Sequence, residues 1–166
     1  RFMSELGKEG KYKTTTNRFA RSWEVLPAGS PNPGTVHHYG AKMFTQEFSG
    51  YKWKRFYALV GGGIPVEEVP VALKRRADEY QVLRTHVEVG KAGKHKIRLK
   101  GDSNHMDLFL DGEPIEIPSD RKDSELEIDC KKTGKRQLML VLLGARSSGQ
   151  VSLEALSEEL TMVNSL

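Results

Sequence analysis

Short segments of alternating apolar and polar residues, separated by turn formers, fill the chain from about residue 80 onward. Residues 80–89 and 94–101 both alternate, and Gly-Lys-Ala-Gly at 90–93 separates them. Residues 106–117 hold Asp111-Gly112 between two apolar runs, which is a strong signal for a two-residue hairpin turn. Because a period of two buries one face of each strand, this pattern predicts antiparallel sheets with hairpins at 80–101 and 106–117.

A further hairpin is predicted over residues 124–143, with its turn at 131–136. Leu126, Ile128 and Cys130 alternate with acidic residues, so the Cys130 thiol should lie on a buried strand face. Residues 138–143 are apolar without interruption, which predicts a central strand buried on both faces. A single cysteine excludes an intramolecular disulfide and a cysteine-based zinc site, and it fits a reducing compartment.

Two segments of the sequence have patterns that a helix could explain. Leu153, Leu156, Leu160 and Val163 have the spacing of one helical face, and the residues between them favour helix, so we expect a C-terminal helix over residues 151–163. In residues 71–80, the preceding proline could open a short helix, but an early strand fits equally well. The sequence leaves that choice open.

Together these segments predict a mainly β, or α+β, fold. We expect an antiparallel β-sandwich or open barrel of about seven strands, a C-terminal helix and an extended N-terminal arm. The arm is placed at residues 1–35, where periodicity is weak and Ala-Gly-Ser-Pro-Asn-Pro-Gly disfavours regular structure. The β-rich domain is placed at residues 36–166, and its first hairpin is expected at 41–60 around Ser49-Gly50.

Aromatic and basic residues are concentrated at the start of the chain. Eleven of the thirteen aromatic residues lie in the first 57 positions, with ten Lys or Arg against four Glu. Aromatic rings bury large areas and cations attract phosphates, carboxylates and ring faces, so this composition favours contact with another molecule. The residues predicted to bind a partner protein or nucleic acid are Phe19, Arg21, Trp23, Lys52, Trp53, Lys54, Arg55 and Tyr57.

Motifs for catalysis or metal binding are not recognisable. The five histidines have no cysteine or carboxylate at a known ligand spacing, and Asp102–Glu113 places apolar residues where a calcium loop needs oxygen ligands. The Gly61–Gly63 run lacks the Lys-Ser/Thr of a phosphate-binding loop. We therefore predict a protein that is not an enzyme, with no catalytic residue, no metal site and no cofactor.

The segment Ser49–Val60, SGYKWKRFYALV, is similar to the second strand of pleckstrin-homology domains, in which Trp-Lys-Arg and two aromatic residues follow a turn. This resemblance covers some twelve residues. It implies a seven-stranded fold with a C-terminal helix. It also implies that Lys42, Lys52, Lys54 and Arg55 lie near a phosphoinositide or partner pocket.

The leading hypothesis is a non-enzymatic structural or interaction subunit of a larger assembly, docked through the aromatic-basic arm onto partner protein or RNA. The alternatives are a module that binds single-stranded nucleic acid through YKWKRFY and a lipid-headgroup or partner-binding module of the pleckstrin type. No apolar run approaches the roughly 18 to 20 residues of a membrane helix, so no membrane span is expected. The chain begins at Arg1 with Met3 close behind, which indicates either two residues before a natural start or an intracellular, mitochondrial protein after presequence removal.

Overall fold

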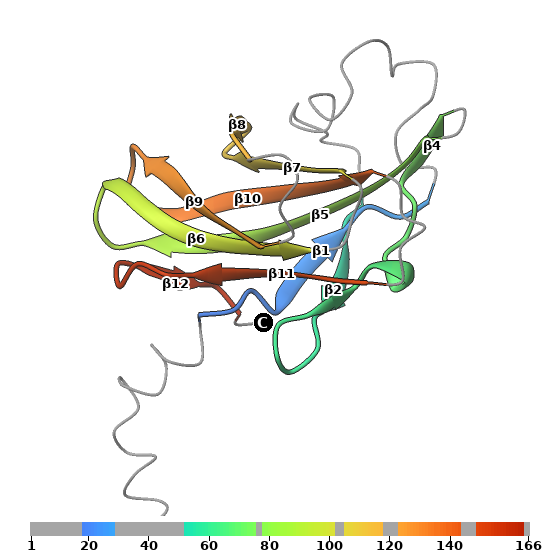
Figure 1. The fold of residues 1–166 in the computed structure, drawn as a ribbon, viewed down its shortest axis with the longest axis horizontal. Helices are drawn as coiled ribbons and strands as arrows, with labels where there is room; N and C mark the ends of the chain where they lie inside the picture. The colour runs from blue at the N-terminus through green and yellow to red at the C-terminus, as the bar shows by residue number, and fades with distance from the viewer. Residues whose placement is uncertain are drawn as a thin grey trace, which may run out of the picture.

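A computed structural model shows a β-sandwich of two antiparallel sheets (Figure 1). It describes residues 18–28, 52–75, 78–101, 105–117, 123–143 and 149–164. The larger sheet has the strand order β2-β1-β5-β10-β7-β8, and β4 and β12 also pair with β5. Its strands are β1 (Ser22–Val25), β2 (Lys54–Tyr57), β4 (Leu73–Arg75), β5 (Asp78–Val89), β7 (His105–Leu110), β8 (Glu113–Ile115), β10 (Gly134–Leu143) and β12 (Leu160–Met162).

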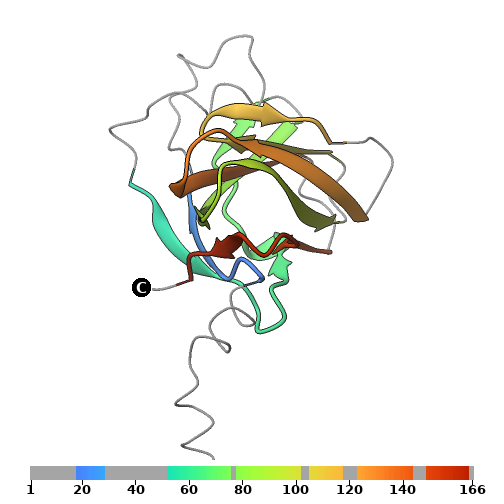
Figure 2. The ribbon, with the colours of Figure 1, turned by 90° about the vertical axis from the view of Figure 1, so that its left-hand side faces the viewer.

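The smaller sheet has the order β3-β11-β6-β9. Its strands are β3 (Ile64–Pro65), β6 (Gly93–Gly101), β9 (Asp123–Cys130) and β11 (Gln150–Ala155). Figure 2, turned by 90°, shows β11 and β12 in red below the other strands and beside β1 and β2 in blue and teal. The predicted antiparallel sandwich is confirmed.

Strand β5 organises the larger sheet. One of its edges pairs with β10 along Tyr80–Val89. Its other edge is shared by three short strands in succession, β4, β1 and β12. Segments from both ends of the described chain thus meet on β5. The side chain of Asn164 strengthens this junction, because its Oδ1 accepts from the backbone N–H groups of Arg21 (2.8 Å) and Ser22 (3.1 Å).

The main core lies between the two sheets. Its apolar residues come from the inner faces of β5, β10, β6 and β11, among them Leu83, Leu140, Ile97 and Leu153. Full burial of one such side chain contributes about 1.5–3 kcal/mol, so this interior is the principal source of stability. A second, smaller apolar cluster lies on the opposite face of the larger sheet. It consists of Leu26, Ala72, Val82, Phe109, Met139 and Val141.

Strand β10 is the central strand that its continuous apolar sequence predicts. Leu138, Leu140 and Leu142 face the main core, whereas Met139 and Val141 belong to the second cluster. The Cys130 side chain is buried in the main core, as predicted from the alternation in β9. Both predictions are confirmed.

The predicted Asp111-Gly112 hairpin is also confirmed. It joins β7 to β8, with Leu110 paired to Glu113. Both turn residues have positive φ, 48° for Asp111 and 85° for Gly112, which suits a two-residue hairpin whose twist matches its strands. The Asp111 Oδ1 also accepts from the Gln137 N–H at 3.0 Å, which holds the turn against β10.

Two predicted hairpins are wrong, because their turns carry the chain from one sheet to the other. The turn after β5 leads into β6, yet β5 pairs with β10 (Val89 with Gly134) and β6 pairs with β9 (Gly93 with Cys130). The turn between β9 and β10 therefore also crosses between sheets, at the same end of the sandwich. Alternation shows that a strand has one buried face but does not show which strand lies beside it.

The predicted C-terminal helix is wrong as well. Residues 150–155 form β11 and residues 160–162 form β12, with a turn between them. Val151, Leu153 and Ala155 alternate, so the segment also has the period of a strand, and their burial completes the inner face of the smaller sheet. In the described part of the chain the one helical element is the 3-10 turn η2 (Val66–Glu68). The helix that the pleckstrin resemblance implies is therefore not found here.

The choice left open for residues 71–80 is decided in favour of strand, since β4 pairs with the start of β5. Between β3 and β4, η2 is held to the core by Gln81. The buried Gln81 amide donates from Nε2 to the carbonyl oxygens of Val66 (2.7 Å) and Val69 (2.8 Å). The predicted hairpin partner of β2, residues 41–48, lies outside the described residues.

Residues 18–28 of the predicted arm lie within the sandwich, where they form β1 and the segments flanking it. The proposed boundary at residue 35 lies outside the described residues. Within the ranges that are described, no helix has the length and apolar character needed to cross a bilayer.

Candidate interaction surface

The antiparallel pairing of β1 with β2 brings together four of the eight predicted binding residues, Trp23, Lys54, Arg55 and Tyr57. Ser22, Trp23 and Glu24 lie opposite Tyr57, Phe56 and Arg55 in the register. Their side chains, however, do not share one surface, because successive residues of a strand point to opposite faces of the sheet. Lys42, which the pleckstrin resemblance includes, lies outside the described residues.

Trp23 lies in the interior of this chain, and Phe19 is half-buried. The Trp23 side chain is 1% exposed, and its Nε1 donates to the Ala20 carbonyl at 2.9 Å. Phe19 pairs through its backbone with Glu154 of β11, so this segment also contacts the smaller sheet. A fully buried ring is inaccessible to a partner in the folded chain, and the Trp23 ring therefore acts in stability.

Trp53 is partly buried against the second apolar cluster. The Arg84 guanidinium carbon lies 4.1 Å from the centroid of the Trp53 ring, and Arg84 Nε donates to Glu24 Oε1 at 3.0 Å. This cation–π contact and ion pair join β2, β5 and β1. One face of the Trp53 ring is consequently covered by a residue of the same chain.

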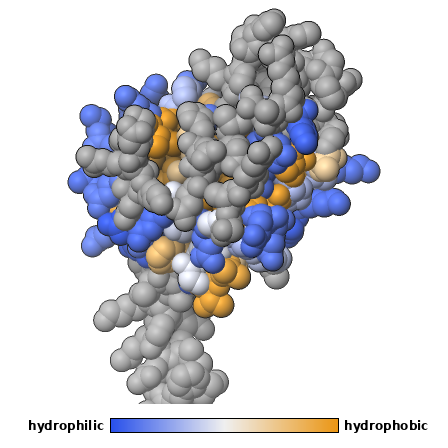
Figure 3. Space-filling model, turned by 45° about the vertical axis from the view of Figure 1, so that its right-hand side comes forward, coloured by the Kyte–Doolittle hydropathy of each residue, from blue (hydrophilic) through white to orange (hydrophobic). Residues whose placement is uncertain are grey.

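The apolar surface next to β2 is exposed. Tyr57, Leu59 and Val60, here called the docking tip, are 55%, 49% and 89% exposed, and they are the well-exposed large hydrophobic side chains of the described residues. Figure 3 shows hydrophobic surface at the lower end of the molecule, where the turn between β2 and β3 lies in Figure 1. Sequence reasoning missed Leu59 and Val60; an apolar pair just before Gly61–Gly63 was the available signal.

The docking tip has a fixed backbone. The Gly62 N–H donates to the Leu59 carbonyl at 2.8 Å, and the Leu59 N–H donates to the Gly63 carbonyl at 2.8 Å. Gly62 has φ 87°, and a Cβ there would lie 2.7–2.9 Å from three carbon atoms of Phe19. Phe19 and Gly62 thus pack in a contact that only glycine permits, and the turn presents Val60 outward.

Three exposed cations, Lys52, Lys54 and Arg55, precede the docking tip in the sequence, the last two within β2. Arg55 Nη1 donates to Ser22 Oγ at 3.3 Å, and no ion pair to another described residue is found for any of the three. Glu24, the acid nearest to them in the register, is already paired with Arg84. Lys54 and Arg55 are successive residues of β2 and point to opposite faces, so positive charge lies on both faces of the strand that leads to the docking tip.

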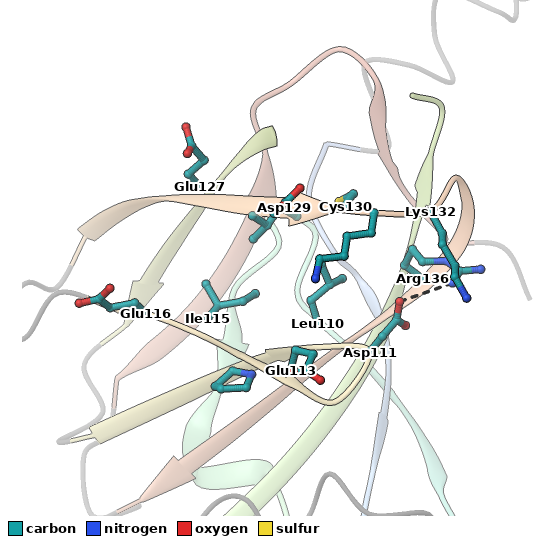
Figure 4. Close-up of a pocket in the computed structure, with 13 residues that line it drawn as sticks. Leu110, Asp111, Glu113, Ile115, Glu116, Glu127, Asp129, Cys130, Lys132 and Arg136 are labelled. Atoms are coloured by element: carbon teal, nitrogen blue, oxygen red, sulfur yellow. Dashed lines mark ion pairs between the residues drawn. The ribbon is translucent and has the colours of Figure 1, made fainter. Parts of the chain in front are cut away.

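A second surface feature is a groove of about 770 Å³ between the β7–β8 hairpin and the end of β9 (Figure 4). Leu110 and Ile115 point into it from the hairpin, while Ile128 and Cys130 line it from β9. Arg136 and Asp111 form an ion pair of 3.6 Å at one end. Sequence reasoning did not predict this groove, because strand patterns do not show how the edges of the two sheets lie relative to each other.

Two titratable groups are shifted from their ordinary values. Burial lowers the pKa of His86 below 6.5, and the nearby cations Lys135 and Arg84 lower it further. Burial, followed by the charge of Asp129, raises the pKa of the Cys130 thiol, which therefore stays protonated and unreactive at neutral pH. Within the described residues no group of three potential metal ligands converges.

No protein-family model matches this chain, and no curated protein matches its sequence. Among solved structures it is similar to a β-glucosidase from Kluyveromyces marxianus in complex with glucose, with 9% identity and a TM-score of 0.44 over 82% of this chain. A GH31 α-xylosidase from Xanthomonas citri is 10% identical, with a TM-score of 0.36 over 85% of this chain. The chain spans 17% and 16% of the lengths of these two proteins.

Proposed function

We propose that the chain is a non-enzymatic interaction module that docks on an acidic protein surface through the docking tip. The observation that carries this proposal is the exposure of Tyr57, Leu59 and Val60 on a hydrogen-bonded turn beside three cations. Exposed apolar side chains rimmed by charge are typical of interaction sites. Because the cations lack acidic partners among the described residues, the complementary surface is acidic.

The fixed backbone of the turn favours binding, since a preorganised loop loses less conformational entropy when it docks. Burial of the exposed area of Val60 would contribute up to about 1.5–3 kcal/mol, and burial of the half-exposed Tyr57 and Leu59 correspondingly less. Association itself costs about 4–15 kcal/mol, so these residues act as the hot spot of a larger interface rather than as the whole of it. Lys52, Lys54 and Arg55 extend that interface and accelerate the encounter with an acidic partner.

The experiment is quantitative co-purification from the cells that make this protein. The chain is compared with a Leu59→Ser/Val60→Ser variant, and with a Glu158→Ser/Glu159→Ser variant changed at two exposed positions in the β11–β12 turn. A protein retained by the unchanged chain and the control, but reduced at least about tenfold by the tip variant, supports the proposal. Equal recovery of every protein with all three chains rejects it.

Single-stranded nucleic acid is the second candidate partner. Tyr57 and the three cations form an exposed aromatic-basic strand of the kind that stacks on bases and neutralises phosphates. The Arg84 contact leaves Trp53 less open for stacking, so protein remains our first choice. Membership of an RNA-containing or organellar assembly stays a prediction.

This alternative is tested by fluorescence anisotropy with a labelled single-stranded RNA. It expects affinity that falls as salt rises, and loss of binding in a Lys54→Glu/Arg55→Glu variant. The Leu59→Ser/Val60→Ser variant separates the two functions. It should lose the protein partner but keep most of its RNA affinity if both activities exist.

A further inference from the structure

The geometry points to a second binding site, in the groove between β8 and β9, for an extended peptide segment of another protein. The segment carries a cation, then an apolar side chain, then an anion, and it runs parallel to β9. This site is separate from the docking tip and does not rest on the proposed function.

The groove lies between two edge strands. β9 ends the smaller sheet and pairs with β6, and β8 ends the larger sheet and pairs with β7; the described residues provide no further strand for either. Alternate backbone N–H and C=O groups of an edge strand point away from its partner. An extended peptide can pair with such an edge and place every second side chain on the floor beneath it.

The floor of the groove is apolar. Leu110 and Ile115 point into the space between the hairpin and β9 (Figure 4). Ile115 is partly buried against the main core, so a side chain placed on it would extend the existing interior. This floor selects an apolar residue at the middle of the bound segment.

The two ends of the groove have opposite charge. Glu116 and Glu127 lie at one end, and Lys132 and Arg136 lie at the other (Figure 4). Arg136 is paired with Asp111 and Glu127 with Lys94, both at 3.6 Å. Five lining charges have no such pair with a described residue: Glu113, Glu116, Asp129, Lys131 and Lys132. Of those labelled in Figure 4, Glu116 and Lys132 lie nearest the two ends, and we assign these two to the ends of the ligand.

The separation of these charges decides the size of the ligand. Lys132 follows Glu127 by five positions, and at about 3.3 Å per residue an extended chain of this length spans at most roughly 16 Å. The ammonium and carboxylate of a single amino acid are too close together to reach both ends. An extended segment of about five residues spans the groove, with its cation near Glu116 and its anion near Lys132.

The test uses NMR spectra of the ¹⁵N-labelled full chain with two pools of five-residue peptides, blocked at both termini. One pool has the form Lys-Xaa-Val-Xaa-Glu and the other Glu-Xaa-Val-Xaa-Lys, with Xaa randomised. The first pool should shift the amide signals of Ile115 and Ile128 at a concentration at least about fivefold lower than the second. Methylation of the central backbone nitrogen should weaken binding by a similar factor, because it blocks strand pairing.

A charge exchange in the protein provides the control. The Glu116→Lys/Lys132→Glu variant should prefer the second pool, whereas Glu67→Lys/Lys100→Glu, changed at exposed positions outside the groove lining, should keep the original preference. The proposal is overturned if neither pool shifts the groove signals, or if both pools shift them equally. It is also overturned if these signals move with the concentration of the chain alone, since a second copy would then be the occupant.

Discussion

The guanidinium carbon of Arg84 lies 4.1 Å from the centroid of the Trp53 ring, on the face of the larger sheet that points away from the smaller one. Because Arg84 also pairs with Glu24, one side chain of β5 holds both short strands at this edge of the sheet. The most conspicuous aromatic-basic sequence of the chain, YKWKRFY, is thus partly engaged in intramolecular contacts. Among the described residues of this sequence, the three cations and Tyr57 remain exposed.

Substitution of Arg84 by alanine should lower the free energy of unfolding by about 1–2 kcal/mol, since it removes both the cation–π contact and a partly exposed ion pair. The stability of the Arg84→Lys variant should lie between that of the unchanged chain and that of Arg84→Ala, because a lysine keeps the charge but not the planar stacking. Urea unfolding followed by Trp fluorescence measures this. The control Arg55→Ala should change stability by less than about 0.5 kcal/mol; an equal loss in both variants would contradict the assignment.

Trp23 and Tyr57 were predicted from the sequence to serve the same binding role, but the structure separates them. Trp23→Ala should destabilise the chain by about 3–5 kcal/mol, because it leaves a large cavity in the main core and an unpaired Ala20 carbonyl. Tyr57→Ala should cost less than about 1 kcal/mol, because that ring is more than half exposed. Thermal and urea unfolding of the two variants measure this difference. Similar losses in the free energy of unfolding would contradict the separate roles of Trp23 and Tyr57.

The glycines of the β2–β3 turn provide a matched pair. Gly62→Ala should cost about 2 kcal/mol or more, because it forces a Cβ against Phe19 in a left-handed backbone conformation. Gly61→Ala should be nearly neutral, because no atom lies within 4 Å of the new Cβ. Unfolding curves of both variants measure the difference. Equal stability would mean that Phe19 does not pack on this turn.

His86 should make stability depend on pH. Its pKa in the folded chain lies below 6.5, so the unfolded chain binds its proton more tightly. The free energy of unfolding should therefore fall as the pH drops from about 6.5 toward the folded pKa, and His86 should have no such effect above that range. The carboxylates of Glu24 and Asp111 act on the pKa of His86 in the opposite direction, but burial and the two cations outweigh them.

Urea unfolding at about pH 7.5 and about pH 5.5 measures the effect. His86→Gln should lose less stability between the two pH values than the unchanged chain. If both chains lost the same amount, another group would have to carry the pH dependence. His95→Gln, at a buried residue whose Nε2 contacts the Lys91 carbonyl at 2.5 Å, shows whether any histidine substitution has this effect.

Local sequence patterns predicted the strands from β5 to β10 and the Asp111-Gly112 hairpin, because these depend on neighbouring residues. The doubly buried β10 could be predicted for the same reason, since its apolar run from Leu138 has no polar face. The turns at 90–92 and 131–133 could not be assigned to sheets, because their geometry depends on β5 pairing with the distant β10. Residues 151–163 fit both the helical period and the strand period. The strand forms because β11 completes the smaller sheet.

The candidate surfaces were less predictable than the fold. Composition indicated an aromatic-basic region but could not separate Trp23, which faces the core, from Tyr57, which faces solvent. Recognition of the groove required the edges of two sheets to be placed side by side, and the sequences of β8 and β9 contain no aromatic residue that would mark them. Neither feature follows from the pattern of a single strand.

The most direct test of the proposed function is photo-crosslinking from a light-activated residue placed at position 60, at the most exposed point of the docking tip. The same residue at position 158, in the β11–β12 turn, serves as the control. In extracts of the native cells, position 60 should give one dominant crosslink to an acidic protein, which weakens as salt rises and is missing from position 158. If position 60 gave no crosslinked protein, or only the products formed from position 158, the docking tip would not be the binding surface.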